Sequence, residues 1–412
     1  MNTYDIAIIG GGAAGMMAAF SAREHHNDAS IVIVDHTFEL GRKILVAGAG
    51  RGNLTNANVE DDNFTHFHGN PNVIKEIFSQ YNGKKIQAFF ENLGVPLYEE
   101  QKTGRGKIFP VVDNAKTVRD ILVDELQKQH IEILTSTEVT GISKNEHGWI
   151  ISADKDDILS QTLILACGGM TYPSLGSNGL GYTLARSIGH TIIEPVPSAV
   201  PLVAKSVLCH FLQGERITME VSTKEHTYMG DVLFTQYGIS GTAIFDISRD
   251  ISIQLNREHT QSVPLYLSFF PGVGKEEVLS IVEKRLLRDP HQLVARSLWG
   301  LFTVKVANAI CAAANIQKET TASTLTNEEK MNLVSTLTRY ELTITGTRGW
   351  NEAEFTSGGI AMDEVDARTL ASKKATHLYI AGELLDVDGD VGGYNLSWAW
   401  ASGWVAGKCS SV

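Results

Sequence analysis

Six residues near the start of the chain, Gly10-Gly11-Gly12-Ala13-Ala14-Gly15, have the types and spacing of a phosphate-binding turn. In the pattern G-x-G-x-x-G, Gly10 makes the tight turn, Gly12 lets the backbone approach a pyrophosphate, and Gly15 lets a helix pack closely on a strand. Asp35 follows 20 residues after Gly15, where it can accept hydrogen bonds from the ribose hydroxyls of an adenosine. These residues predict a dinucleotide site. The motif does not separate FAD from NAD, whereas Asp35 disfavours NADP, because its carboxylate would face a 2′-phosphate.

The elements around this turn are those that must position it. Tyr4–Ile9 and Ser30–Val34 are apolar runs without alternation, which predicts parallel strands buried on both faces. Between them, Met16–Arg23 is rich in small residues and predicts a helix that packs on the sheet. The N-terminus of that helix would offer free N–H groups and a partial positive charge to the pyrophosphate.

A loop with three cations follows the second strand and carries Arg42, Lys43 and Arg51, with Asn53 and Thr55 close behind. A nicotinamide dehydrogenase would normally begin its next crossover helix here. Cations, amides and hydroxyls instead suit the phosphates and the hydrogen-bonding rim of a flavin ring. A solvated basic loop is the alternative interpretation.

Two further apolar strands, predicted at 162–167 and 376–381, run into Gly168-Gly169 and Gly382-Glu383. Glycine at a strand end allows backbone to approach a flat cofactor, although a simple strand-to-helix turn would also use it. Gly392-Gly393 opens an apolar helix predicted from about 397 to 406. The positive end of such a helix would stabilise the negative charge of a reduced flavin.

The region just before that helix has two features with alternative interpretations. Asp386, Asp388 and Asp390 resemble a calcium loop only superficially, because the glycine and the distal glutamate of an EF-hand are missing from their places. We therefore predict no metal site. The tryptophans at 398, 400 and 404 are expected to pack in the core rather than line a substrate box.

Together these segments predict FAD as the bound cofactor. The residues expected to contact it lie in the glycine-rich turns, at strand ends and in the cationic loop. They are Gly10, Gly12, Ala13, Ala14, Gly15, Asp35, Arg42, Lys43, Gly50, Arg51, Asn53, Thr55, Val139, Ala166, Gly168, Gly169, Gly382, Glu383, Asp386, Gly393, Tyr394, Asn395 and Leu396.

The chain resembles the BaiN-like NAD(P)/FAD-dependent oxidoreductases, bacterial flavoproteins mostly of unassigned substrate. The resemblance is carried in order along the chain by GGGAAG, ELGRKIL, GRGNLTN, GRGKIFP, ACGG, GLGYTLARSIGH, LFTQYGISG, FTSGGI and SKKATHLYIAGELLDVDGDVGGYNLSWAWASGWVAGK. It implies an α/β fold in which a discontinuous, glutathione-reductase-type, Rossmann-like FAD domain is split by an inserted β-barrel and a small helical subdomain. More distantly, the layout is similar to the flavoprotein subunits of fumarate reductase and succinate dehydrogenase.

Three positions depart from the family pattern. Gly52 stands where the family usually has the cysteine of Arg-Cys-Asn, Leu180 replaces the acid of Gly-Asp-Gly, and Thr242 replaces the proline of Ser-Gly-Pro. The FAD-binding pattern survives these changes. No role of the missing thiol or acid is carried over to this chain.

Composition delimits the insert. A proline-rich exit at 194–201 precedes short β-prone pieces (ITMEVST, DVLFTQYG, TAIFDIS, ISIQLN and VPLYLSFF), which predict an antiparallel barrel or sandwich. Residues 275–316 have helical spacing, and Thr324 or Thr326 is the expected cap of a further helix. The predicted domains are 1–193 with 347–412 (FAD-binding), 194–274 with 333–346 (barrel) and 275–332 (helical).

The chain carries one convincing dinucleotide motif, assigned to FAD, so NAD(P)H is expected to dock only transiently as hydride donor. The acceptor would be a small molecule, such as one with a carbon–carbon double bond conjugated to a carbonyl. Its reduction needs a proton donor and a carbonyl clamp. Arg51, Arg105, Tyr172, His190, Tyr237 and Arg348 are candidates, but such residues are more often structural, and we assign no catalytic role.

Charge and cysteine usage bound the remaining classes. A net charge of −12 argues against nucleic-acid and anionic-membrane partners. The four cysteines form no C-x-x-C, and no segment has the pattern of a signal peptide or bilayer span, so we expect a cytoplasmic protein. An FAD-dependent RNA-modifying enzyme and a flavin-binding redox sensor without turnover are the alternatives. No pattern indicates an oligomeric state.

Overall fold

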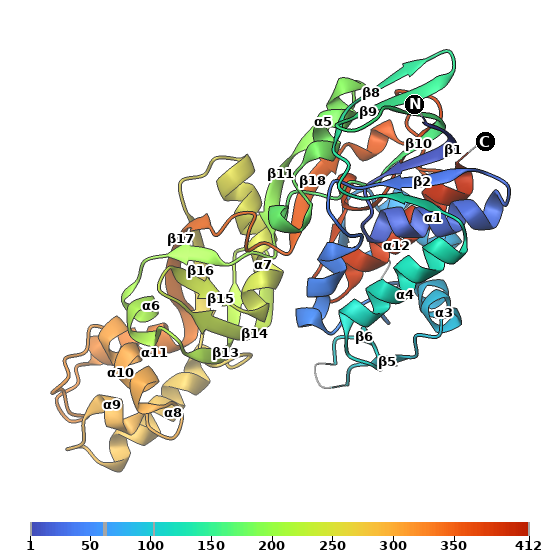
Figure 1. The fold of residues 1–412 in the computed structure, drawn as a ribbon. Helices are drawn as coiled ribbons and strands as arrows, with labels where there is room; N and C mark the ends of the chain where they lie inside the picture. The colour runs from blue at the N-terminus through green and yellow to red at the C-terminus, as the bar shows by residue number, and fades with distance from the viewer. Residues whose placement is uncertain (1, 61–63, 102–103, 411–412) are drawn as a thin grey trace. The chain divides into compact units, whose positions relative to one another are not determined.

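The computed structural model describes residues 2–60, 64–101 and 104–410. The chain forms two compact units, drawn as a ribbon in Figure 1. Unit 1 is Met1–Pro195 together with Glu354–Val412, and unit 2 is Val196–Ala353. Each unit buries a continuous apolar cluster of its own.

A seven-stranded sheet is the centre of unit 1. Its strands are β1 (Asn2–Ile9), β2 (Ile31–Val34), β7 (Glu132–Leu134), β8 (Val139–Asn145), β9 (Gly148–Ala153), β10 (Ile158–Leu165) and β19 (Leu378–Ile380). The order is β7-β2-β1-β10-β9-β8, with β19 also beside β10. β7, β2, β1, β10 and β19 pair in parallel, and the β8–β9 hairpin is antiparallel. The parallel strands predicted from the glycine-flanked apolar runs are confirmed.

The register of the sheet brings the predicted glycine turns to one edge. Ile9 at the end of β1 pairs with both Val34 and Leu165. The residues that follow, Gly10, Asp35 and Ala166, therefore leave the sheet side by side. β2 is buried over its whole length, as its run of Ile and Val predicts.

The helices of unit 1 are α1 (Ala13–His25), α2 (Pro71–Gln80), α3 (Gly83–Asn92), α4 (Ala115–Lys128), α5 (Leu180–Ser187) and α12 (Tyr394–Cys409), with 3₁₀ turns at 42–50, 173–175, 362–364 and 382–384. α1 and α12 pack through small residues. A Cβ on Gly403 would lie 2.3 Å from the carbonyl oxygen of Ala14, and one on Gly407 would lie 2.1 Å from that of Ala18. The two backbones are therefore close enough that only glycine fits at positions 403 and 407 of α12.

Three small sheets lie outside the seven-stranded sheet and the barrel among the described residues. They are β3 (Thr55–Asn56) with β6 (Lys107–Pro110) and β5 (Leu97–Glu99), β4 (Phe67–His68) with β20 (Asp388–Gly389), and β11 (Ile192–Ser198) with β18 (Phe355–Ile360). The β4–β20 pair joins segments that lie more than 300 residues apart in sequence. The sequence analysis did not predict this pairing.

Unit 2 contains a closed six-stranded barrel in the order β12-β15-β14-β13-β16-β17. Its strands are β12 (Leu202–Ala204), β13 (Arg216–Ser222), β14 (Thr227–Phe234), β15 (Gly238–Ser240), β16 (Val263–Ser268) and β17 (Tyr340–Thr347). Its helices are α6 (Val207–Leu212), α7 (Thr242–Ser252), α8 (Lys275–Arg288), α9 (Val294–Ser297), α10 (Val304–Ala313) and α11 (Asn327–Arg339). Thr326 caps α11 in a capping box with Glu329, as one of the two predicted alternatives.

One local prediction in this unit is wrong. The pieces TAIFDIS and ISIQLN were expected to be strands, but they form α7 and a π-helical turn at Ile253–Arg257. The buried side chains of α7 include Ala243, Ile244, Ile247 and Ile251, which is the spacing of a helix face. Isoleucine favours strands by propensity, and tertiary packing overrides that preference here.

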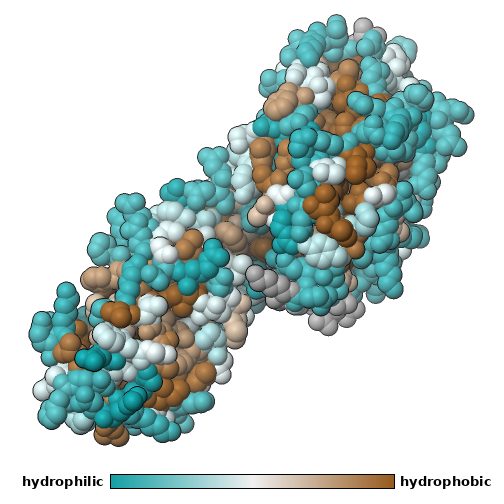
Figure 2. Space-filling view, turned by 60° about the horizontal axis from the view of Figure 1, so that its bottom comes forward, coloured by the Kyte–Doolittle hydropathy of each residue, from teal (hydrophilic) through white to brown (hydrophobic). Residues whose placement is uncertain are grey.

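The border between the units falls at 195/196 and 353/354. Barrel strands and helices of unit 2 share one apolar cluster. The three-part domain division therefore stays a prediction. Hydrophilic residues predominate on the face shown in Figure 2, with apolar patches between them. In the described part of the chain, no helix combines the length and hydropathy needed to span a bilayer.

Candidate functional site

The turn between β1 and α1 is built around backbone that only glycine tolerates. Gly10 has φ +105°, and a Cβ there would lie 2.4 Å from the carbonyl oxygen of Ala166. A Cβ on Gly15 would lie 1.8 Å from the carbonyl oxygen of Gly10. Gly12 differs, because it is extended (φ −77°) and has no atom within 4 Å of its Cβ position. The helix begins at Ala13, so the N–H groups of its first turn have no partner within the helix.

Asp35 is fixed at the end of β2 by the backbone of the same turn. Its Oδ2 accepts from the Gly11 N–H at 2.6 Å. Its Oδ1 accepts from the Thr37 N–H at 2.8 Å and from the Thr37 hydroxyl at 2.6 Å. The carboxylate therefore has a set orientation at the rim of a pocket.

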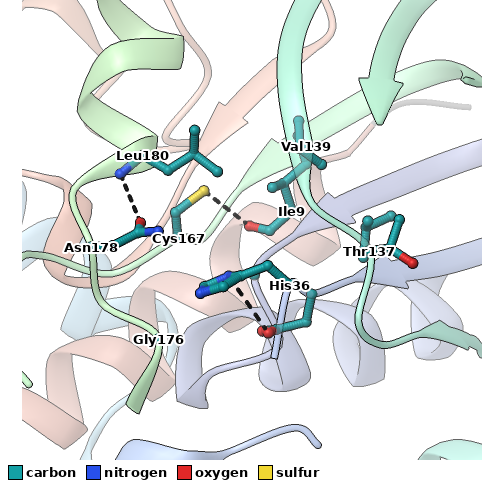
Figure 3. Close-up of a pocket in the computed structure, with 11 residues that line it drawn as sticks. Ile9, His36, Thr137, Val139, Cys167, Gly176, Asn178 and Leu180 are labelled. Atoms are coloured by element: carbon teal, nitrogen blue, oxygen red, sulfur yellow. Dashed lines mark hydrogen bonds and ion pairs between the residues drawn. The ribbon is translucent and has the colours of Figure 1, made fainter. Parts of the chain in front are cut away.

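That pocket, drawn in Figure 3, is a partly open hollow, and its empty volume of about 350 Å³ includes open solvent. Of the predicted residues, Gly10, Asp35 and Val139 line it, and the remaining lining residues are Ile9, Val34, His36, Thr137, Cys167, Gly176, Asn178 and Leu180. Apolar walls beside a carboxylate suit a nucleoside, whose base is flat and whose ribose donates hydrogen bonds. The other eight were not predicted as contacts, although Ile9, Val34 and His36 adjoin Gly10 or Asp35, and Cys167 and Leu180 lie in the quoted segments ACGG and GLGYTLARSIGH.

Cys167 lines the pocket, and its thiol lacks the low pKa of a redox-active cysteine. Burial raises the pKa of its thiol to about 12. The Sγ donates to the carbonyl oxygen of Ile9 at 3.4 Å, as Figure 3 shows. A thiol with so high a pKa is a poor nucleophile, so Cys167 is a wall of the pocket.

Lys43 in the cationic loop forms an ion pair with Glu383, which follows β19. Lys43 Nζ lies 2.7 Å from Glu383 Oε2 and 2.9 Å from the Thr171 hydroxyl. Glu383 Oε1 accepts from the Thr356 N–H at 2.7 Å. The pair is mostly buried and holds the cationic loop against the ends of β10 and β19, which directs both charges toward protein partners.

The two arginines of the loop also have protein partners. Arg51 contacts Glu100 Oε1 at 2.8 Å and the Tyr98 hydroxyl at 2.7 Å, and its guanidinium lies over the Phe109 ring. Arg42 lies over the exposed ring of Phe38 at 4.9 Å. Their contact with a cofactor stays a prediction.

Asn53 carries the clearest sign of a missing partner. Its Oδ1 is buried and has no hydrogen-bond donor among the described residues. A buried acceptor without a donor costs about 1–3 kcal/mol, so the site fits a group that brings an N–H or O–H to it. Nearby, the Thr55 hydroxyl is bonded to that of Ser397 at 2.8 Å, and Gly50 takes φ +84° in the preceding turn.

The end of β10 is held tightly. The Ala166 N–H donates to Ile9, and Gly168 has φ +70°. A Cβ on Gly169 would lie 2.2 Å from the Thr356 hydroxyl, so packing against β18 also requires glycine there.

The start of α12 lies against the same region. Gly393 (φ +105°) would place a Cβ 2.5 Å from the carbonyl oxygen of Thr55. Gly382 (φ +76°) would place one 2.8 Å from the Cβ of Ala14. The structure thus brings the ends of the predicted site, Ala14, Thr55, Gly382 and Gly393, into contact within unit 1.

The side chains after Gly393 have separate tasks. The Asn395 amide accepts from the Gly389 N–H at 2.9 Å and donates to its carbonyl at 2.7 Å, which fixes the preceding loop. Tyr394 is buried, Leu396 packs partly buried on the core, and the Asp386 N–H donates to Ile360. Trp398 and Trp400 are buried, as predicted for core residues.

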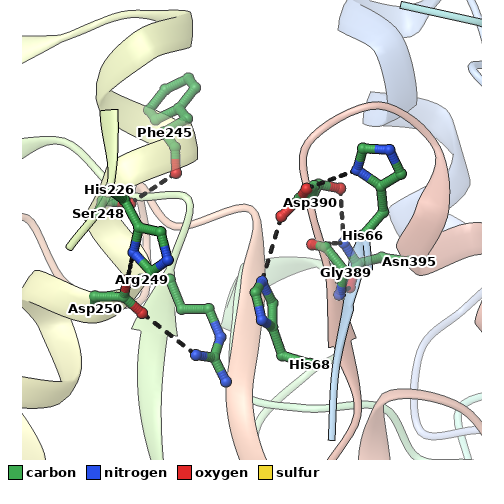
Figure 4. A network of polar contacts seen from close by, with 10 residues as sticks. All are labelled: His66, His68, His226, Phe245, Ser248, Arg249, Asp250, Gly389, Asp390 and Asn395. Carbon is green, nitrogen blue, oxygen red and sulfur yellow. Dashed lines mark hydrogen bonds and ion pairs between the residues drawn. The ribbon is translucent and has the colours of Figure 1, made fainter. Parts of the chain in front are cut away.

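Three titratable side chains form a cluster whose contacts the sequence pattern does not predict. Asp390 contacts His66 Nδ1 at 2.9 Å and His68 Nε2 at 3.3 Å (Figure 4). Burial works to raise the pKa of Asp390, but hydrogen bonds from His68 and His66 outweigh it, and the pKa lies below its ordinary value. The alternating histidines in His66-Phe67-His68 were the signal that could have found them.

Two of the other candidate catalytic residues, His190 and Arg348, are paired with neighbouring side chains. His190 is buried between Glu364 at 3.1 Å and the Ser372 hydroxyl at 2.8 Å. In unit 2, Arg348 lies over the Tyr237 ring and pairs with Glu352. Tyr172 takes φ +53° before a 3₁₀ turn, and the Arg105 carbonyl accepts from Asn56.

The three departures from the family pattern also have places. Gly52 has φ +86° and would bring a Cβ within 3.2 Å of Ala115. Leu180 lines the pocket, and Thr242 begins α7. No group of three or more metal-ligating side chains is found within the described residues.

Comparison with known proteins agrees with this architecture. The family model described as HI0933-like protein Rossmann domain matches residues 4–409. A 3-dehydro-bile acid delta(4,6)-reductase of Clostridium scindens is 35% identical, covering 98% of both chains. A ribosomal RNA dihydrouridine synthase of Escherichia coli is 29% identical, covering 99% of this chain and 98% of that one.

Among solved structures, a 3-ketosteroid-delta4-(5alpha)-dehydrogenase from Rhodococcus jostii matches with a TM-score of 0.50 at 13% identity, covering 99% of this chain and 97% of that chain. At this identity the match shows the shared fold. The family match spans nearly the whole chain, and it confirms the resemblance seen in the sequence motifs. The chain belongs to the HI0933-like protein Rossmann domain family and is an FAD-dependent oxidoreductase of the BaiN-like kind.

Proposed function

We propose that this enzyme takes a hydride from NAD(P)H and reduces a carbon–carbon double bond conjugated to a carbonyl in a small molecule. The observation that carries the proposal is the form of the site. The pocket beside Asp35, the glycine turn before α1 and the N-terminus of α12 all belong to unit 1, and we assign a single dinucleotide, FAD, to them, which leaves NAD(P)H to bind transiently. Bound FAD supplies the exchange of a hydride between donor and acceptor.

The predicted contacts divide along this dinucleotide. We assign Asp35 and Val139 to the adenosine and residues 10–15 to the pyrophosphate. Residues 50–55, 166–169 and 382–396 are assigned to the flavin half. The unpartnered Asn53 Oδ1 supports the last assignment, since the edge of a flavin ring carries an N–H donor.

The names of the relatives support the acceptor class. A 3-dehydro bile acid with double bonds at carbons 4 and 6 has its 3-oxo group conjugated with them. Dihydrouridine is uridine with its 5,6 double bond saturated, and that bond is conjugated with the 4-carbonyl. Both names therefore describe addition of a hydride and a proton to the same functional group.

Three measurements test the proposal on the purified enzyme. Heat denaturation should release FAD, and release of FMN would overturn the cofactor assignment. Anaerobic NADH or NADPH should bleach the bound flavin. Absence of bleaching with either would remove pyridine nucleotide as donor. Reoxidation of the reduced enzyme by 2-cyclohexen-1-one or by a 3-oxo-4,6-diene bile acid then tests the acceptor.

A second candidate is reduction of uridine in RNA. It is favoured by the near-complete coverage of the dihydrouridine synthase. The net charge of −12 weighs against it, because phosphate backbones attract basic surfaces. Reoxidation by a ribosomal RNA transcript but not by the enones would favour this candidate. A redox sensor would be reoxidised by neither.

A further inference from the structure

His66, His68 and Asp390 lie beside the start of α12, and neither histidine has a part in the contacts proposed above. Figure 4 shows both imidazoles directed at the one carboxylate. His66 uses Nδ1 and His68 uses Nε2, so each ring keeps its second nitrogen on the side away from Asp390. The side chains of His66 and His68 are 36% and 32% exposed, so a small molecule can reach them.

Several independent contacts hold this cluster in place. β4 pairs with β20 through His68 opposite Asp388, and the Asp390 N–H donates to the carbonyl of His66 at 2.9 Å. Asn395 clamps the neighbouring Gly389 through two hydrogen bonds. The geometry of the carboxylate and the two rings is therefore set by the backbone.

The cluster is also attached to the helix end assigned to the flavin. The His66 ring stacks on Tyr394, the first residue of α12, with centroids 4.5 Å apart and an interplanar angle of 22°. Gly392 and Gly393 immediately precede that residue. The His66 ring is therefore in direct contact with Tyr394, a residue predicted to contact the flavin.

The surroundings add few competing charges. Asp388 on β20 is 2% exposed and has contacts of its own, as has Asp386 earlier on that loop. The side of β4 toward α2 is aromatic, with Phe67 against Phe78 at 5.1 Å. The ionised Asp390 carboxylate is therefore shared mainly by the two histidines.

We propose that His66 and His68, positioned by Asp390, donate the proton in the reduction of the acceptor. This inference rests on the proposed function. In the step, the π bond of the conjugated acceptor breaks and two C–H bonds form. The carbon far from the carbonyl gains the hydride with its electron pair, derived from NAD(P)H. The carbon next to the carbonyl gains a proton from an imidazolium nitrogen, which keeps the N–H electron pair and is reprotonated by water.

The first test separates this step from reduction of the cofactor. The flavin of wild type, H66Q, H68Q and H66Q/H68Q is reduced photochemically without NAD(P)H and mixed anaerobically with 2-cyclohexen-1-one. We expect the double variant to be reoxidised at least about 100-fold more slowly, the usual worth of a positioned proton donor. The matched control is H147Q, whose side chain is 70% exposed on the β8–β9 turn and should react as wild type. Reoxidation of the double variant at the wild-type rate would overturn the inference.

The second test uses D390N, which removes the negative charge to which both rings are bonded. We expect its limiting reoxidation rate to fall at least about tenfold, while the enone concentration that gives half of that rate stays as in wild type, because Asp390 positions the proton donor and does not bind the acceptor. D390E, which keeps a carboxylate, should recover part of the rate. D124N, on the exposed face of α4, is the control. A limiting rate of D390N equal to that of wild type would contradict the inference.

The outcomes distinguish the two proposals. If wild-type enzyme is reoxidised by no conjugated acceptor, the proposed function fails and this inference falls with it. If wild type is reoxidised and the histidine variants match it, only the inference fails. A rate loss in the double variant with unchanged flavin bleaching by NAD(P)H, together with the lower limiting rate of D390N, supports both.

Discussion

Gly10 and Gly12 lie two residues apart in the same turn, yet the structure constrains them in different ways. Gly10 has a positive φ and a carbonyl oxygen in the place of a Cβ, whereas Gly12 has neither restriction. A side chain at Gly12 would have no described atom within 4 Å of its Cβ. Conformation therefore requires the first glycine, and a ligand would require the second.

We predict that G12A folds but binds FAD at least about tenfold more weakly, a loss of about 1.4 kcal/mol, because the new methyl group occupies the space assigned to the pyrophosphate. Apoprotein titrated with FAD gives the affinity, and thermal denaturation of the apoprotein gives the stability. The control is G141A on β8, which also has no atom within 4 Å of its Cβ position. Equal FAD affinity in the two variants would refute the assignment of the turn.

Glu364 is predicted to be a pH-dependent anchor near His190. Burial works to raise its pKa, but hydrogen bonds from Thr191, Lys374 and His190 outweigh it and lower the pKa from 4.5 to about 2. Since the folded-state pKa is depressed, the contribution to stability is present above about pH 4.5 and is lost as pH falls toward 2. E364Q should therefore reduce the free energy of unfolding by about 1–3 kcal/mol at pH 7.

The measurement is the difference in thermal midpoint between wild type and E364Q from pH 7 to the lowest pH at which both fold. The difference should shrink as pH falls below about 4.5. E146Q, at a side chain that is 86% exposed, should show no difference. A gap that stays constant with pH would mean that shape, not charge, stabilises this site.

At the scale of elements, the contact between α1 and α12 determines how closely the two ends of the cofactor site approach. Alanine normally favours a helix over glycine by about 1 kcal/mol. At Gly407 the added Cβ would meet a carbonyl oxygen at 2.1 Å, so we expect G407A to destabilise unit 1 by about 1–3 kcal/mol instead. Denaturant unfolding of the apoprotein measures this.

G83A is the matched control for that substitution. Gly83 begins α3, and its nearest neighbour would be Val59 Cβ at an ordinary 3.5 Å. G83A should leave stability unchanged or slightly higher. If G407A also left stability unchanged or slightly higher, the close approach of α1 and α12 would be wrong.

Elements were predictable where local pattern and burial coincide. β1, β2, β10 and β19 are apolar runs that lead into glycine or aspartate within a few residues, and each overlaps the strand that the sequence predicts. α7 was mispredicted because its isoleucines have strand propensity but helical spacing. In the segment between 57 and 131, the sequence analysis drew on GRGKIFP and Arg105 but did not predict α2, α3 or α4.

The residues of the candidate site were likewise predictable only where one local segment carries the pattern. Asp35 and the glycine turns were found because one short segment carries the whole signal. His66 and Asp390 come together only through the β4–β20 pair, whose register is a tertiary property. Thr37 and Asn178 were missed because a single polar residue in a loop has no pattern around it.

At the scale of the whole molecule, unit 2 is one continuous piece of chain with its own core and a barrel that leaves no strand edge unpaired. We predict that residues 196–353 expressed alone fold with a cooperative thermal transition and do not bind FAD. Circular dichroism and FAD titration check the two parts. A non-cooperative transition would show that this core depends on unit 1, and FAD binding would place part of the cofactor site in unit 2.

Unit 1 is made from two stretches of chain, and α1 packs on α12, which is translated only after all of unit 2. Domains usually fold in the order in which they leave the ribosome. The β1–α1 segment therefore cannot complete its packing until α12 has been synthesised. Its small-residue face stays uncovered while the barrel folds. The FAD-binding half begins synthesis before the insert and completes folding after it, which makes the nascent first half a natural client for a chaperone.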